Sequence, residues 1–166
     1  TTFSANELVD GVVNVVTPMA KQNQNKIVIQ NRLTTKAEDL ICTDEIKLNQ
    51  ILLNIVSNAV KYTQNGAIYI NLERDGDSAI FKVVDSGIGI AESHLAIIFN
   101  PFEQIENSYS RRFSGSGLGL TISKRLIDLL SGEIEVESQL GHGSTFSIRI
   151  PVGVRDSKKI TTEIDF

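Results

Sequence analysis

Two asparagines, a lysine and a tyrosine share one side of a predicted helix that is otherwise apolar. They are Asn54, Asn58, Lys61 and Tyr62, and at about 100° per residue they lie on one face. A buried amide without a partner costs about 1–3 kcal/mol, so the two asparagines need something to bond. This helix alone leaves two explanations open: bonds to neighbouring backbone or water, and bonds to a ligand.

A second polar segment, Asp85 to Ile90, follows a hydrophobic stretch, and its acidic residue stands where a predicted strand ends. Gly87 and Gly89 would let a backbone approach a planar or phosphate ligand closely. A buried carboxylate needs donors, and an exocyclic amino group is one candidate. Taken alone, the segment favours a simpler interpretation, a strand-to-helix turn with aspartate as a local turn former.

A third segment, Gly115 to Leu120, leads directly into a predicted helix. Backbone amides at a helix N-terminus bind anions, and glycines remove the side chains that would block them. The spacing is neither that of a Walker loop nor that of the dinucleotide fingerprint. Arg111 and Arg112 precede the glycines, and either could reach a phosphate. A flexible hinge and a solvated arginine pair are the alternatives.

The two histidines, His94 and His142, stand apart from each other and from any cluster of cysteines or carboxylates. The sequence therefore predicts no zinc site. It also contains no readable Ser-His-Asp pattern.

Composition limits the possible classes of protein. A length of 166 residues indicates one domain. Hydrophobic residues make up 41% and charged residues 22%, which excludes a disordered or collagen-like chain. The net charge of -4 argues against general nucleic-acid binding, and no apolar run is long enough to span a membrane. The single cysteine, Cys42, indicates a reducing compartment.

The order of elements predicts helices on one face of a mixed, mostly antiparallel sheet. Ser4 and Glu7 form a capping box that begins the first helix; Pro18 kinks or ends its first stretch, with continuation as polar helix beyond Pro18 left open. Thr43 or Asp44 caps the second helix. The other expected elements are strands over 26–33, 67–73, 79–84, 133–137 and 144–150, helices up to about 62, over 92–98 and over 120–130, and a long polar loop over 103–117. Residues 1–152 form the domain, and 153–166 form a linker or tail.

Five segments, in this order, resemble the conserved boxes of the catalytic, ATP-binding domain of sensor histidine kinases, in the GHKL superfamily. The resemblance covers roughly residues 3–151. The segments are Asp44 to Thr63, Asp85 to Ile90, Ile98 to Gln104, Gly115 to Leu120 and Gly141 to Phe146.

The resemblance implies an α/β (α+β) two-layer sandwich, a mixed five-stranded sheet covered on one face by three helices, with a long ATP lid loop over 103–116. It also implies roles. Asp85 would accept a hydrogen bond from the adenine amino group. Asn58 would hold Mg²⁺, Asn54 would support the metal and phosphates, Lys61 would face phosphate charge, and Tyr62 would line the nucleotide.

Further residues take their roles from the same resemblance. Thr145 would sit near Asp85 at the adenine end, and Arg111 is a better candidate for phosphate contact than Arg112. The remaining nucleotide-binding residues would be Gly87, Gly89, Ile90, Phe102, Gly115, Ser116, Gly117, Leu118, Gly119 and Leu120.

Asn54 separates the histidine kinases from related ATPases, which carry a glutamate at this position as general base. An amide cannot take a proton at neutral pH, so we expect slow ATP hydrolysis. Neither His94 nor His142 is followed by an acidic residue, as the family's phosphoacceptor is. We therefore expect the acceptor on another part of a longer kinase.

The resulting hypothesis is a histidine kinase catalytic domain that binds Mg²⁺ and ATP. It would donate the γ-phosphoryl group to a histidine on the dimerisation domain of the same kinase, upstream of a response regulator. We expect an isolated monomer in the cytoplasm, with membrane anchoring of the parent left open. The alternatives are a self-sufficient ATPase of the same fold and a nucleotide-free docking module.

Overall fold

The computed structural model of the chain describes residues 1–99 and 119–153. None of the helices in these ranges is long and apolar enough to cross a membrane. Along the chain the elements are β1 (Thr2–Ser4), α1 (Ala5–Gln22), β2 (Lys26–Asn31), α2 (Lys36–Asp39), β3 (Leu40–Cys42), α3 (Glu45–Lys61), β4 (Ala67–Asp75), β5 (Ser78–Asp85), α4 (Glu92–Leu95), α6 (Gly119–Leu129), β6 (Glu133–Ser138) and β7 (Ser144–Pro151).

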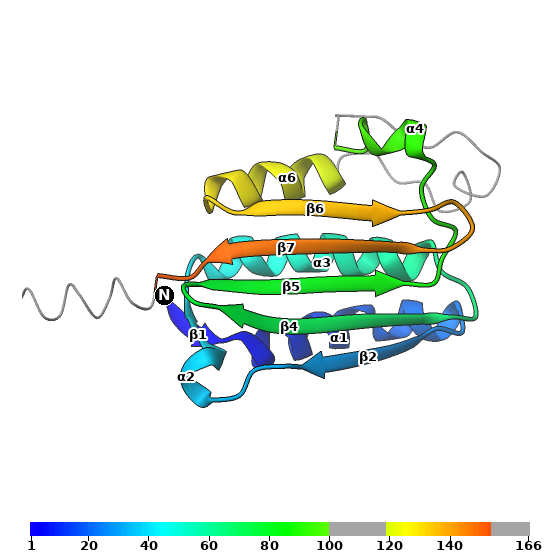
Figure 1. Ribbon diagram of the computed structural model, residues 1–166. Helices are drawn as coiled ribbons and strands as arrows, with labels where there is room; N and C mark the ends of the chain where they lie inside the picture. The colour runs from blue at the N-terminus through cyan, green and yellow to red at the C-terminus, as the bar shows by residue number, and fades with distance from the viewer. Residues whose placement is uncertain (100–118, 154–166) are drawn as a thin grey trace, which may run out of the picture.

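A five-stranded sheet with the order β2-β4-β5-β7-β6 forms one layer of the molecule. Strand β2 runs parallel to β4, and the other neighbours are antiparallel. Helices α1, α3 and α6 form the second layer, behind the sheet in Figure 1. The predicted two-layer sandwich with a mixed, mostly antiparallel sheet is therefore confirmed.

The two-residue alternation of the strands creates the core. In β5, Ala79, Phe81 and Val83 are buried, and Asp85 continues the same alternation. In β7, Phe146 and Ile148 are buried in the same way. Because successive side chains point to opposite faces, these residues all lie on the side that the helices cover. Asp85 thus ends β5 on the inner face of the sheet.

The long helices begin where the capping residues predict. The Ser4 side chain accepts a hydrogen bond from the Glu7 backbone N–H at the start of α1, and Asp44 accepts one from Lys47 at the start of α3. Helix α1 continues through Pro18 and ends at Gln22, so Pro18 does not end it. Pro18 lies on the exposed side of the helix, where water can satisfy the carbonyl that proline leaves without a donor.

Three short elements were not predicted. Strands β1 and β3 pair in a separate antiparallel ribbon, and α2 forms one turn before β3. Asp39 connects this region to α1, because its carboxylate accepts hydrogen bonds from the Ser4 hydroxyl and from the backbone and side chain of Asn6. Helix α4 ends at Leu95, which makes it shorter than the predicted 92–98.

Candidate functional site

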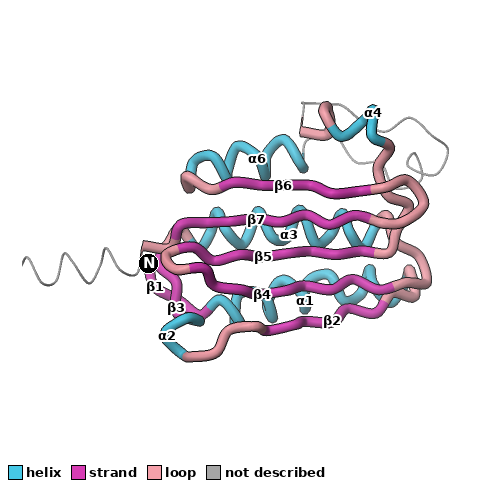
Figure 2. The backbone as a smooth tube through the Cα atoms, in the orientation of Figure 1, coloured by secondary structure: helices cyan, strands magenta, loops and turns pink. Residues whose placement is uncertain are grey.

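The end of α3 and the segment after β5 meet at one end of the sheet. Tyr62 closes α3 by donating its backbone N–H to the Asn58 carbonyl, 3.0 Å away, and its own carbonyl accepts from the Ile88 N–H at 3.1 Å. The β6–β7 turn lies at the same end, as the loops in Figure 2 show. The Gly141 N–H donates to the Ile88 carbonyl at 2.7 Å. Three segments that are far apart in sequence therefore form one site.

Asp85 lies at the base of this site and is only 8% exposed. Its carboxylate accepts from the Gly87 backbone N–H at 2.9 Å and from the Ser144 backbone N–H. Burial raises the pKa of the Asp85 carboxyl above its usual value, and the two backbone donors partly offset the rise. A carboxylate offers about four acceptor positions, so capacity remains for a donor from a ligand.

Gly87 and Gly89 are needed by the protein's own backbone. A Cβ at Gly87 would collide with the Tyr62 carbonyl oxygen and lie 2.7 Å from the Thr63 hydroxyl. Gly89 has a φ of +72° and faces the Gln139 carbonyl. These glycines let the segment after β5 pack against α3 and the β6–β7 turn, and the prediction that they also let a ligand approach stays a prediction.

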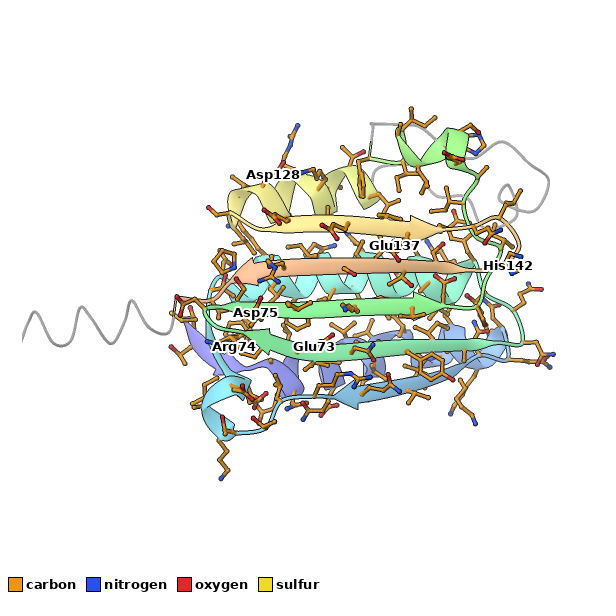
Figure 3. The ribbon with its side chains drawn as sticks, viewed as in Figure 1. Glu73, Arg74, Asp75, Asp128, Glu137 and His142 are labelled. Atoms are coloured by element: carbon orange, nitrogen blue, oxygen red, sulfur yellow. The ribbon has the colours of Figure 1, made fainter. Side chains whose placement is uncertain are left out.

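Serine hydroxyls join the two glycine segments. The Ile90 N–H donates to the Ser138 hydroxyl at 2.7 Å, and Ser138 in turn contacts the Gly143 carbonyl at 2.9 Å and the Ser144 hydroxyl at 2.7 Å. Ile90 therefore contributes a backbone donor that binds the protein itself. His142 lies in the exposed turn beyond these residues (Figure 3).

Thr145 lies next to the strand partner of Asp85, but its side chain points to the opposite face of the sheet. Thr145 pairs with Val84 and shares its outward face, whereas Ser144 pairs with Asp85, is buried, and points inward. Sequence reasoning missed Ser144. Counting the two-residue alternation back from the apolar Phe146 would have found it.

Asn54 and Asn58 differ in their surroundings. The Asn54 Oδ1 accepts from Gln50 Nε2 at 2.9 Å, and its Nδ2 donates to Ser123 Oγ at 3.2 Å and to the Gly119 carbonyl at 3.4 Å. The Asn58 side chain makes no hydrogen bond with the described residues and is half-buried. Asn54 therefore bonds to the protein, whereas the Asn58 amide has no hydrogen-bond partner within residues 1–99 and 119–153.

The remaining predicted residues fall into two groups. Lys61 and Tyr62 end α3 beside the site, both half-buried, and burial raises the pKa of the Tyr62 hydroxyl. Gly119 and Leu120 form the first turn of α6, next to Asn54. The other predicted residues lie outside the described ranges, as does the lid over 103–116: Phe102, Arg111, Gly115, Ser116, Gly117 and Leu118.

A metal ion at this site would have to be one that needs few protein ligands. Within residues 1–99 and 119–153, no group of three or more His, Cys, Asp or Glu could hold a metal ion. Mg²⁺ is different, because it keeps several waters and takes only one or two protein oxygens together with substrate phosphates. The available Asn58 amide oxygen fits that requirement.

Comparison with known proteins identifies the family. The model for the histidine kinase-, DNA gyrase B-, and HSP90-like ATPase family matches residues 43–154. The autoinducer 2 sensor kinase/phosphatase LuxQ of Vibrio cholerae is 39% identical over 90% of this chain and 18% of its own length. The circadian input-output histidine kinase CikA of Synechococcus elongatus is 39% identical over 90% of this chain and 20% of its own length.

Solved structures agree with these sequence matches. ShkA, solved at full length in complex with AMPPNP, has a TM-score of 0.78 and 32% identity, covering 92% of this chain and 31% of that one. The catalytic domain of the histidine kinase ThkA has a TM-score of 0.77 and 28% identity, covering 92% of this chain and 95% of that one. The chain spans about a fifth of the curated relatives and nearly all of the ThkA domain. It therefore belongs to the histidine kinase-, DNA gyrase B-, and HSP90-like ATPase family and is the catalytic domain of a sensor histidine kinase.

Proposed function

We propose that this domain binds Mg²⁺-ATP and, within a longer sensor histidine kinase, donates the γ-phosphoryl group to a histidine on a separate dimerisation domain. The observation that carries the proposal is the buried Asp85 carboxylate, which two backbone donors hold at the base of the site. Asn58, whose amide bonds to none of the described residues, lies in the last turns of α3, and the C-cap of this helix, Tyr62, contacts the segment after β5.

Asp85 would select the base. A carboxylate accepts hydrogen bonds, so it can receive the exocyclic amino group of adenine. Guanine carries a carbonyl oxygen at the equivalent position of its ring, and two acceptors facing each other in a buried site repel. Because Gly87 and Ser144 fix the carboxylate, selection needs no rearrangement of the protein.

The phosphates would lie between the end of α3 and the start of α6. The amide oxygen of Asn58 would hold the magnesium ion, and Lys61 would face the phosphate oxygens. Gly119 and Leu120 begin α6, and the first N–H groups of a helix have no partner within it. Mg²⁺ would supply neutralisation of the charge that develops on the transferred group. The chain's own residues would bind and orient the nucleotide.

Asn54 favours transfer of the γ-phosphoryl group to a partner over rapid hydrolysis of ATP. An amide cannot accept a proton from water at neutral pH, and both ends of this amide already bond to Gln50 and α6. The attacking group would then be the histidine nitrogen of a partner domain. ThkA has been crystallised with the response regulator TrrA, and we propose a response regulator as the downstream partner here as well.

Calorimetric titration with Mg²⁺-ATP, metal-free ATP and Mg²⁺-GTP tests the proposal. Wild type should bind Mg²⁺-ATP most tightly, and Asp85→Asn should lose that preference because an amide presents a donor where adenine also donates. Asp10→Asn is the matched control, since Asp10 is exposed on α1. The proposal fails if wild type does not bind Mg²⁺-ATP, or if Asp85→Asn binds it as well as the control does. Rapid ATP hydrolysis by the chain alone would favour the self-sufficient ATPase.

A further inference from the structure

We propose that Gln50 and Ser123 are positioning residues that act through Asn54. Together they hold the first turn of α6 against α3, where the phosphates of the nucleotide would bind. This inference rests on the proposed function. The Asn54 network consists of Gln50, Asn54, Ser123 and the carbonyl of Gly119. Asn54 is then a positioning residue, not a direct ligand of metal or phosphate.

The network crosses the gap between two helices. Gln50 lies one turn before Asn54 on α3, and its Nε2 donates to Asn54 Oδ1 at 2.9 Å. On the other side Asn54 Nδ2 donates to Ser123 Oγ at 3.2 Å, and Ser123 Oγ donates to the Gly119 carbonyl at 2.9 Å. Ser123 is fully buried, so its hydroxyl has no access to water as a substitute partner.

The bonding pattern allows only one orientation of the Asn54 amide. The Gly119 carbonyl only accepts hydrogen bonds, so the amide must turn its Nδ2 toward α6. The Oδ1 then faces Gln50, whose Nε2 is the donor it requires. Gln50 therefore completes the network from an exposed position, because it supplies the donor for the Oδ1 that the contacts with α6 leave facing it.

The position of the first turn of α6 matters because the proposed phosphate site lies between α3 and α6. Asn58 is one helical turn beyond Asn54 on α3, and Gly119 begins α6. A Cβ at Gly119 would meet no described residue within 4 Å, so tight packing against the described backbone does not fix the position of this turn. The Asn54 network spans α3 and α6 at this point, and a satisfied polar network specifies one arrangement better than apolar contact does.

Substitutions at an exposed and at a buried member test the network independently. A carboxylate cannot donate, so Gln50→Glu either reverses the Asn54 amide or leaves it without its donor. Asn49→Glu is the matched control, because it places the same charge on the neighbouring exposed residue. Ser123→Ala removes the bridging hydroxyl. Its control is Ser57→Ala, which removes a hydroxyl that, among the described residues, bonds to the Asn54 backbone carbonyl alone.

Binding of two ligands, Mg²⁺-ATP and adenosine, distinguishes an effect at the phosphate end of the nucleotide from an effect at the adenosine end. Affinity for Mg²⁺-ATP is measured by calorimetry, and affinity for adenosine by ligand-observed NMR, with thermal unfolding to check that each variant folds. Loss of one hydrogen bond of this kind should weaken Mg²⁺-ATP binding by about three- to tenfold relative to each control. Affinity for adenosine, which lacks phosphates, should stay the same.

The outcomes distinguish this inference from the proposed function. If wild type binds Mg²⁺-ATP and both Gln50→Glu and Ser123→Ala bind it as their controls do, the inference is wrong and the proposed function stands. Equal losses for Mg²⁺-ATP and adenosine would also overturn it, because they would indicate a general structural role. No Mg²⁺-ATP binding by wild type would refute the proposed function, and the inference with it.

Discussion

Two glycines of the β6–β7 turn provide a matched pair for measuring how closely this turn packs against Asp85. Gly141 and Gly143 both have a φ of +86°. A Cβ at Gly141 would meet nothing within 4 Å. A Cβ at Gly143 would collide with the Asp85 carbonyl oxygen and lie 3.0 Å from its carbonyl carbon and 3.1 Å from Ser86 Cα. The obstacles at Gly143 are backbone atoms, which cannot move aside as a flexible side chain would.

The expected magnitudes follow from these two environments. Positive φ at an alanine costs about 1–2 kcal/mol, which both Gly141→Ala and Gly143→Ala incur. Overpacking adds about 1–3 kcal/mol at Gly143 alone. At about 2–4 °C per kcal/mol for a chain of this size, Gly141→Ala should lower Tm by about 2–8 °C and Gly143→Ala by about 4–20 °C.

Thermal unfolding without nucleotide measures both variants, and calorimetry with Mg²⁺-ATP then tests the site. Because Gly143→Ala pushes on the backbone of Asp85, it should also weaken nucleotide binding, whereas Gly141→Ala should not. Equal losses of Tm in the two variants would refute the reasoning, since positive φ would then account for the whole effect.

Two further predictions concern Asp85 and Asp39. Burial raises the pKa of the Asp85 carboxyl, so the contribution of this group to stability is fully present below the usual aspartate pKa and is lost as pH rises through the raised pKa. Asp85→Asn lacks this loss, so its Tm relative to wild type should increase as pH rises above the usual aspartate pKa, and a constant difference would contradict the prediction. Asp39→Ala removes the acceptor of hydrogen bonds from Ser4 and Asn6. It should lower the free energy of unfolding, measured in urea, by about 1–3 kcal/mol. The control Asp10→Ala, on the exposed side of α1, should lower it by less than about 0.5 kcal/mol. Equal costs for the two alanine variants would show that the Asp39 hydrogen bonds do not stabilise the start of α1.

Long elements were predictable because their signals are local. Ser4 and Asp44 cap α1 and α3 where the sequence indicates, and the hairpin of β4 and β5 follows from period-two alternation around Gly76. Strands β1 and β3 have three residues each, too few to show a period. Tertiary contacts stabilise them, among them the hydrogen bond between the Cys42 N–H and the Val152 carbonyl.

Two details of the site show where local reasoning stops. Thr145 and Ser144 are adjacent hydroxyl residues; the alternation of β7 decides which one faces inward, but only the register of β7 against β5 places Ser144 opposite Asp85. The Asn54 amide bonds to Gly119 and Ser123, which are 65 and 69 residues away. No spacing within α3 can indicate such partners.

The sequence by itself determined the residue types of the site, the order of the long elements and the family, because these depend on local composition, periodicity and motif spacing. It placed Asp85 at the end of a strand and Asn58 on an apolar helix, as observed. Only the tertiary structure decided which groups have partners. Asn54 is bonded across to α6, the Asn58 amide has no hydrogen-bond partner in the described part of the chain, and Gly87 and Gly143 are pressed against backbone. Hydrogen bonding and close packing depend on distances of a few ångströms between segments that are distant in sequence.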